Sequence, residues 1–170
     1  MEEHFSVRAA TPSDREELID LKCRCTQLLY TGYLPESYLQ KIDTAYAAQV
    51  VDTWLQDTAC VIGVLDLGGR LGGYIVCEPD RELQGWGIIQ DTGADKDMSV
   101  DQKWELTRWA IETMRERGCG RIHIWLLQDN LRGRFTFESF GFKGQREMKQ
   151  ISRADYAMAV RRYTYDPLSD

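Results

Sequence analysis

The stretch from Leu106 to Phe142 constrains the fold more than any other part of the chain, because it holds three elements joined by short connections. Apolar residues spaced three and four apart predict an amphipathic helix that ends at Gly118. The nearly continuous apolar run at 121–127 is typical of a central strand covered on both faces. A second helix over 131–140 stops at a Gly-Phe pair. A helix, a buried strand and a helix in this order predict a layered α/β fold.

Turn residues and apolar periodicity predict the remaining elements. We expect a strand at 5–9, a helix that begins at 11–14, a second helical region at 36–55, a hairpin of strands at 59–67 and 71–77, a strand at 85–91, a helix that begins near 100, and strands at 142–148 and 156–163. No repeat or linker interrupts this order, so it predicts one domain over residues 1–170.

Composition excludes several classes of protein. No apolar run approaches the roughly 20 residues that cross a bilayer, and the acidic start, Met1-Glu2-Glu3-His4, has no apolar core. We therefore expect neither a membrane partner nor a signal peptide. The five cysteines are expected to be reduced thiols in a cytoplasmic protein. No CxxC pair accompanies them, so no metal is expected.

The negative charge is concentrated in one segment, 78–105, which we call the acidic segment. It holds eight acidic and three basic residues, a net −5 of the total −6. Such a field repels nucleic acid and attracts a cationic amine. The alternative is a solvated acidic loop. Composition leaves both interpretations open.

Four local patterns together resemble the GNAT superfamily, the acyl-CoA-dependent N-acyltransferases. They are Val7-Arg8-Ala9-Ala10-Thr11-Pro12-Ser13-Asp14, Tyr30-Thr31-Gly32-Tyr33-Leu34-Pro35-Glu36-Ser37-Tyr38-Leu39, Glu116-Arg117-Gly118-Cys119-Gly120-Arg121, and Asp129-Asn130 followed by Glu138-Ser139-Phe140-Gly141-Phe142. The resemblance implies a GNAT-like α/β fold, with a mixed, mostly antiparallel central sheet flanked by helices on both faces. It also implies a small-molecule N-acyltransferase that moves an acetyl group from acetyl-CoA, or another acyl group from its acyl-CoA, to an amine.

The chain departs from the family where the family binds the CoA pyrophosphate. There a turn of the type Arg/Gln-x-x-Gly-x-Gly/Ala presents backbone amides at the start of the third helix. The corresponding positions, 98–103, contain no glycine, so the motif is degenerate. The resemblance leaves Ser99 and Lys103 as cofactor-binding candidates, although Ser99 also fits an ordinary helix cap. Asp101 would compete with an anion for the helix dipole.

Other site residues follow from the same resemblance. Asp91 and Glu78, near the ends of two strands, are the candidate bases. Asn130 is expected beside the pantetheine arm of CoA or as a helix cap. Arg134, with its neighbour Arg132, would reach the 3′-phosphate of CoA. Phe137 stands where the family often has a tyrosine as general acid.

The acceptor pocket is expected in the loop between the first two helices. Tyr30, Tyr33 and Tyr38 would bind a cationic amine through their aromatic faces. The alternative is that Tyr30 and Tyr38 only pack the helices. An exposed aromatic residue such as Phe135 would suit pairing of two copies in a homodimer.

Two hypotheses therefore remain at the level of sequence. The first is an acyl-CoA-dependent N-acyltransferase with an altered pyrophosphate loop. The second is a protein of the same fold that no longer uses CoA, either a non-catalytic binding or pairing module or an enzyme repurposed for another reaction. Fold by itself does not choose between them, because function depends on the site.

Overall fold

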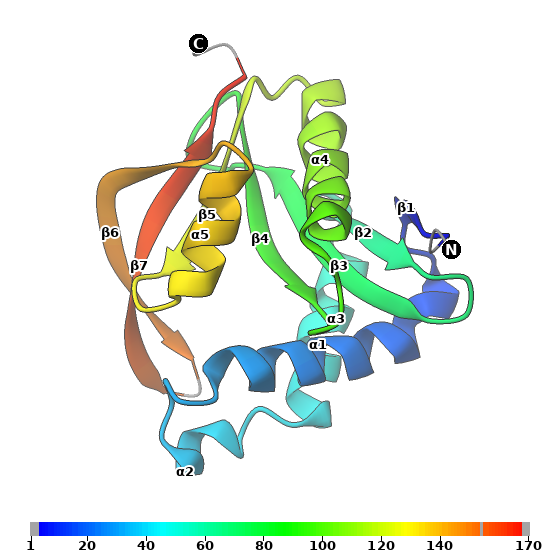
Figure 1. The fold of residues 1–170 in the computed structure, drawn as a ribbon, viewed down its shortest axis with the longest axis vertical. Coiled ribbons are helices and arrows are strands. Elements are labelled where there is room, and N and C mark those ends of the chain that lie inside the picture. Colours follow the sequence, from blue (N-terminus) through cyan, green and yellow to red (C-terminus); the bar gives the residue numbers. More distant parts are fainter. Residues whose placement is uncertain (1–3, 154, 168–170) are drawn as a thin grey trace.

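Seven strands form one sheet, in the order β1-β2-β3-β4-β5-β7-β6 (Figure 1). The computed structural model describes residues 4–153 and 155–167, so most of the acidic N-terminus considered above lies outside the described residues. The strands are β1 (Ser6–Ala9), β2 (Val61–Asp66), β3 (Leu71–Pro79), β4 (Trp86–Ala94), β5 (Arg121–Leu127), β6 (Lys143–Arg153) and β7 (Tyr156–Tyr165). All neighbours are antiparallel except β4 and β5. The predicted mixed, mostly antiparallel α/β sheet is confirmed.

Helices cover the sheet on both faces, as predicted. They are α1 (Arg15–Tyr30), α2 (Glu36–Leu39), α3 (Thr44–Gln56), α4 (Val100–Glu116) and α5 (Leu131–Ser139), with a 3-10 turn at Pro12–Asp14 before α1. Figure 1 shows α4 and α5 in front of the sheet and α3 behind it. The core repeats this division, because alternate residues of β3 point to opposite faces. Ile75 packs in the cluster with α4, and Val76 packs in the cluster with α1 and α3.

The helical region expected at 36–55 is two helices, which corrects the prediction. The four-residue helix α2 ends at Leu39, and α3 begins only at Thr44. The break has a local cause. Asp43 has extended backbone, and its side chain accepts a hydrogen bond from the amide of Tyr46 at 2.9 Å. An N-cap of this kind starts a new helix.

The end of α4 agrees with its sequence signal. Gly118 has a φ of 88°, which favours glycine, and its amide donates to the carbonyl of Arg115 at 2.9 Å. The amide of Cys119 donates to the carbonyl of Met114 at 3.0 Å. These two bonds form a Schellman motif, which ends the helix and turns the chain into β5. Within the described residues, no helix is both long enough and apolar enough to cross a membrane.

A candidate active site where β4 and β5 separate

The parallel strands β4 and β5 separate halfway along their length. In the described part of the chain their pairing runs from Trp86 and Arg121 to Ile89 and Ile124, and not beyond. A bulge in β4 coincides with this point. Cys77 of β3 pairs with Ile89 and Val76 pairs with Asp91, so the residue between, Gln90, has no partner on β3. A bulge bends its strand and often lies beside a functional site.

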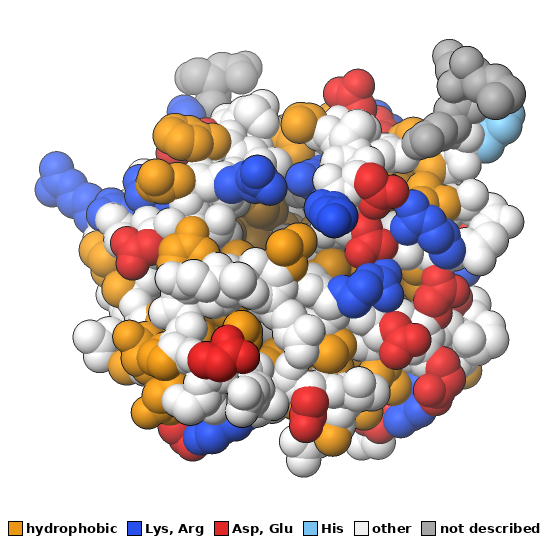
Figure 2. Space-filling model, turned by 60° about the horizontal axis from the view of Figure 1, so that its bottom comes forward, with side chains coloured by type: hydrophobic (Ala, Val, Ile, Leu, Met, Phe, Trp, Pro, Cys, Tyr) orange, Lys and Arg blue, Asp and Glu red, His pale blue; other side chains and the backbone are white. Residues whose placement is uncertain are grey.

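A cavity of about 490 Å³ opens between the separated strands. Its wall includes residues 90–94 of β4 and 124–127 of β5, together with side chains of α1, α4, α5 and β6. Figure 2 shows this face of the molecule, with a hollow at its centre and several Lys and Arg side chains around the opening. A volume of this size suits a small-molecule ligand or a cofactor.

Basic side chains dominate the charge of the cavity wall. The basic residues are Lys22, Lys96, Lys103, Arg132 and Arg153, and the acidic residue is Asp91. The acidic segment therefore contributes one carboxylate to the cavity and not an acidic field. Several of its other acids have partners elsewhere: Asp95 pairs with Arg24 at 2.9 Å and with Arg70 at 3.1 Å, and Glu105 pairs with Arg108 at 2.7 Å. The cavity is consequently suited to an anionic ligand.

Asp91 lies directly after the bulge and is held by two side chains. One carboxylate oxygen accepts a hydrogen bond from the ammonium of Lys22, and the other accepts from the hydroxyl of Tyr74 at 3.4 Å. The Lys22 side chain is only 9% exposed, whereas that of Asp91 is 25% exposed. Burial of a charged lysine is costly unless a carboxylate compensates it, so each residue stabilises the charge of the other. Burial, and then the charge of Asp91, raise the pKa of Tyr74 well above its ordinary value, and its hydroxyl stays protonated.

Two of the three predicted acceptor tyrosines line the cavity. Tyr30 is buried there, and this burial is the main cause of its raised pKa. Tyr33 also lines the cavity, and its hydroxyl donates to the carbonyl of Asp129 at 2.9 Å, which joins the loop after α1 to the loop after β5. Tyr38 lies outside, with its ring edge against Tyr156 at 5.3 Å between centroids. Tyr38 therefore has the packing environment that the alternative interpretation describes.

The N-terminus of α4 is closed by its own side chains. The hydroxyl of Ser99 accepts from the amide of Gln102 at 3.1 Å, and the side chain of Gln102 accepts from the amide of Ser99 at 2.8 Å. The amide of Lys103 donates to the carbonyl of Ser99 at 3.1 Å. This capping box uses amides that a glycine-rich turn would offer to a phosphate. Ser99 is a helix cap here and does not line the cavity, whereas Lys103 does.

The N-terminal half of α5 supplies the opposite wall. Asn130 both caps this helix, by accepting from the amide of Gly133 at 3.0 Å, and lines the cavity. Arg132 lines the cavity as well. Arg134 points elsewhere: it donates to the hydroxyl of Tyr163 at 2.7 Å and to the carbonyl of Gln128 at 2.9 Å.

The aromatic end of α5 completes this wall. Phe137 is buried on the cavity wall and contacts the rings of Phe140 and Phe142, at 5.8 and 5.1 Å between centroids. It offers no proton to a reaction in the cavity. Phe135, in contrast, is 66% exposed on the outer side of the same helix.

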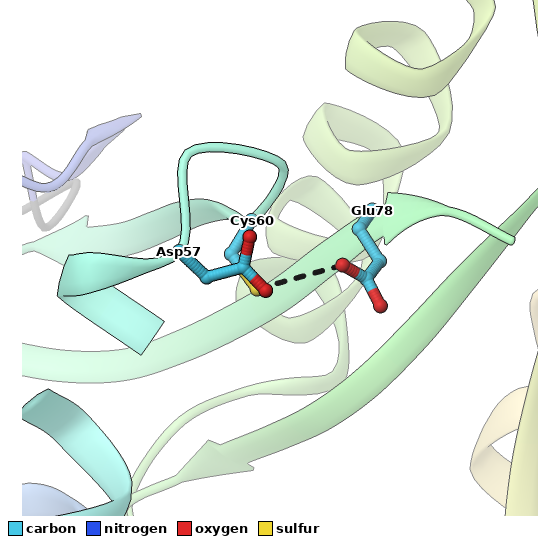
Figure 3. Close-up of side chains that lie close together, drawn as sticks. All are labelled: Asp57, Cys60 and Glu78. Atoms are coloured by element: carbon cyan, nitrogen blue, oxygen red, sulfur yellow. Dashed lines mark hydrogen bonds between the residues drawn. The ribbon is translucent and has the colours of Figure 1, made fainter. Parts of the chain in front are cut away.

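Glu78 lies outside the cavity, in a second group of side chains (Figure 3). One ligand atom from each of Asp57, Cys60 and Glu78 lies within 4.8 Å of the others. Arg81 compensates part of the charge of the two carboxylates, because it contacts Asp57 at 2.9 Å and Glu78 at 3.5 Å. Burial and the two carboxylates raise the pKa of Cys60 to about 12, so its thiol stays protonated when no cation is bound.

His123 is also separate from the cavity. It is buried in β5 between the rings of Trp86 and Trp125, and its Nε2 lies 2.6 Å from a carboxylate oxygen of Asp80. Burial lowers the pKa of His123, so the ring is neutral at physiological pH and its Nε2–H donates to Asp80. His123 is therefore a buried core residue that is bonded through Nε2.

Comparison with known proteins identifies the fold. No protein-family model and no curated protein sequence matches the chain. Solved structures do match: a probable acetyltransferase from Staphylococcus epidermidis has a TM-score of 0.73 at 12% identity and covers 96% of this chain and 99% of its own. The PaiA N-acetyltransferase of Thermoplasma acidophilum, in complex with coenzyme A, has a TM-score of 0.71 at 15% identity and covers 95% and 99%. The ribosomal-protein-alanine N-acetyltransferase of Brucella melitensis has a TM-score of 0.70 at 14% identity and covers 95% and 99%.

These neighbours define the class of fold. The chain has the fold of the GNAT N-acetyltransferases over nearly its whole length, as the sequence patterns predict. At 12–15% identity the similarity describes the fold and not the reaction. The reaction must be argued from the cavity.

Several residues of the cavity were not among the predicted site residues, and Lys22, Tyr74, Lys96 and Arg153 are the polar ones on which the argument depends. Lys22 had a detectable signal, because it follows Leu18 by four positions and therefore lies on the apolar stripe of its helix. A lysine on a buried stripe needs a carboxylate partner. Tyr74 and Arg153 had no such signal, since their place in the cavity depends on how distant strands meet.

Proposed function

We propose that the protein is a small-molecule N-acyltransferase that transfers an acetyl or other acyl group from acyl-CoA to an amine. The cavity between β4 and β5 carries this proposal. It has a single carboxylate on β4 and basic residues where α4 and α5 begin. A neighbour of the same fold is in complex with coenzyme A.

The donor set at the α4 and α5 end fits the charges of CoA. Lys96 lies in the loop before α4, Lys103 lies in the first turn of α4, and Arg132 lies at the start of α5. Side-chain cations would hold the pyrophosphate and the 3′-phosphate in place of the amides that the capping box uses. Asn130 would contact the pantetheine arm. Acyl-CoA, when bound, supplies the activated thioester.

Asp91 is the proposed base for the acceptor, a small-molecule amine that is cationic until it loses a proton. The carboxylate would accept a proton from the ammonium group. Lys22 and Tyr74 fix its orientation from one side. Tyr30 lines the cavity and is protonated. It would act as the general acid in place of the tyrosine that the family often has at the position of Phe137. The proposed location is the cytoplasm, because its reducing environment suits the five free cysteines.

The capping box of α4 favours a second candidate function. The amides of Ser99 and Gln102 are bound internally, and Asp101 adds a negative charge to the first turn. A GNAT-fold protein that no longer binds CoA would need no free amides there. Its cavity would then bind a different anion, either as a non-catalytic module or as an enzyme for another reaction.

Calorimetric titration with acetyl-CoA, desulfo-CoA and a short acyl-CoA series tests the choice. We expect saturable micromolar binding, about −8 kcal/mol. Lys103→Gln and Arg132→Gln should each weaken it about tenfold, since each removes one charged contact to a phosphate. Arg146→Gln is the matched control, because Arg146 is exposed on β6 and does not line the cavity. Absence of binding at millimolar acetyl-CoA would contradict the proposal and leave the second candidate.

A further inference from the structure

The end of the cavity beneath α1 and β6 has its own charge balance. Three charged residues line it: Lys22 from α1, Asp91 from β4 and Arg153 from β6. Lys22 and Asp91 form an ion pair and cancel one another. Arg153 has no carboxylate partner among the described residues; its guanidinium donates to the carbonyl of Ser152 at 3.1 Å. This end of the cavity therefore carries a net charge of +1, with Arg153 as the unmatched cation.

Tyr30 lines the cavity together with the unmatched cation and the carboxylate. Burial raises the pKa of Tyr30, the charge of Arg153 lowers it, and the charge of Asp91 raises it further. Both groups therefore lie close enough to Tyr30 to act on the same phenol. A ligand seated against Tyr30 would share the cavity with both the carboxylate of Asp91 and the guanidinium of Arg153.

The net charge of +1 at this end of the cavity can be compared with the charge of an acceptor in its reactive form. An amine attacks an acyl carbon only after it loses a proton, so a simple amine reacts as a neutral molecule. An amine that also bears a carboxylate reacts with a net charge of −1. Only the second class compensates the +1 of this end of the cavity, and a guanidinium binds a carboxylate with paired, charge-assisted hydrogen bonds.

We propose that the acceptor is an amine that also carries a carboxylate, such as a free amino acid, with its carboxylate on Arg153 and its amine directed toward Asp91. This assignment rests on the proposed acyltransferase function. The amine nitrogen forms a bond to the acyl carbon as the carbon–sulfur bond breaks. Of the two protons that the ammonium loses, one goes to the departing thiolate and the other reaches solvent through Asp91.

Competing acceptor pools test the assignment. The full-length protein is incubated with acetyl-CoA and an equimolar pool of the twenty proteinogenic amino acids. A parallel reaction contains the corresponding amino acid amides, which keep the amine and lack the free carboxylate. Mass spectrometry identifies the acetylated products. We expect one or a few acetylated amino acids, formed at least about tenfold faster than their amides, because the amides lose the charge-assisted contact.

Variants separate a specificity role from a structural one. Arg153→Gln should raise KM for the selected amino acid about tenfold, change kcat little, and leave acetyl-CoA binding unchanged. Arg153→Lys should restore part of the loss, because it keeps the charge without the paired geometry. Arg146→Gln, on the same strand but outside the cavity, should behave as wild type.

A binding measurement without CoA keeps this test independent of turnover. Saturation-transfer NMR with a pool of N-acetylated amino acids should give signals with the wild type and lose them with Arg153→Gln. Equal acetylation of the amide pool, or product signals unaffected by Arg153→Gln, would overturn the assignment while acetyl-CoA binding still supported the acyltransferase. A different result would overturn the proposed function instead. In that case the wild type would not bind acetyl-CoA, but it would bind the N-acetylated pool and lose this binding in Arg153→Gln.

Discussion

Asp91 and Glu78 are carboxylates on adjacent strands of one sheet, and their surroundings differ. Asp91 follows the bulge in β4 and lines the cavity, where a buried lysine pairs with it. Glu78 lies near the end of β3, beside Cys60 and an exposed arginine, Arg81. Both are ion-paired, so pairing does not distinguish them. The point where β4 leaves β5 therefore decides which carboxylate can meet a ligand.

Removal of each carboxylate should give the largest contrast. Asp91→Asn should lower kcat/KM for acyl transfer by about 100-fold or more, the usual effect of losing a general base. Glu78→Gln should change it by less than about threefold, because Glu78 does not line the cavity. Steady-state assays of thiol release measure both values. Equal losses in the two variants would contradict the assignment of Asp91.

The ion pair of Asp91 should also appear in stability. Asp91→Asn leaves the ammonium of Lys22 buried without a counter-charge. We expect a loss of about 2 kcal/mol in the free energy of unfolding, between the values for exposed and for fully buried pairs, because Asp91 is partly exposed. Thermal unfolding followed by circular dichroism measures it.

The double variant Lys22→Met with Asp91→Asn is the matched control for this loss. It removes both charges, so it should recover most of the stability and none of the activity. Recovery of activity in the double variant would mean that Asp91 acts only through the pair and not as a base.

A third carboxylate, Asp80, belongs to a buried pair whose contribution to stability should depend on pH. Its partner His123 is buried, and burial lowers the pKa of His123 from 6.5. As the pH falls below about 6.5, the unfolded chain takes up this proton before the folded one does, so stability should fall. Chemical unfolding at pH 7.5 and pH 5.5 should show this decrease in the wild type and a smaller one in His123→Gln. An equal decrease in both would assign it to other groups.

The smallest expected effect concerns the surroundings of Glu78. Burial and the neighbouring carboxylates raise the pKa of Cys60 to about 12. Glu78→Gln removes one of these negative charges and should increase the alkylation rate of Cys60 at pH 8.5 by about threefold. Peptide mass spectrometry of iodoacetamide-treated protein measures Cys60 separately from the other thiols. Asp91→Asn serves as the distant control and should leave the rate unchanged.

Local sequence signals predicted most of the secondary structure because their causes are local. Gly118 ends α4 through two hydrogen bonds within a few residues, and Asn130 caps α5 in the same way. The break before α3 was missed because its cause, the cap at Asp43, lies inside a continuous helical pattern. Aspartate also occurs on the exposed surface of helices, so its presence in the sequence does not by itself predict that a helix ends and a new one begins.

The candidate site was predictable only in part. Asp91, Tyr30, Tyr33, Lys103 and Asn130 line the cavity, but Glu78, Ser99, Tyr38 and Arg134 are engaged elsewhere. The sequence gives the net charge of the acidic segment directly. It could not predict which of the carboxylates face the cavity, since arginines of α1 and of the turn before β3 pair with some of them.

Local patterns were enough to predict the order of helices and strands and hence the GNAT fold, because periodicity, caps and glycine turns act over a few residues. The charge of the cavity and the set of residues that line it depend instead on how distant elements pack. Lys22, Asp91 and Arg153 come from α1, β4 and β6. They meet because β4 bends at its bulge and leaves β5, and the positions of residues so far apart along the chain follow from packing rather than from any local pattern.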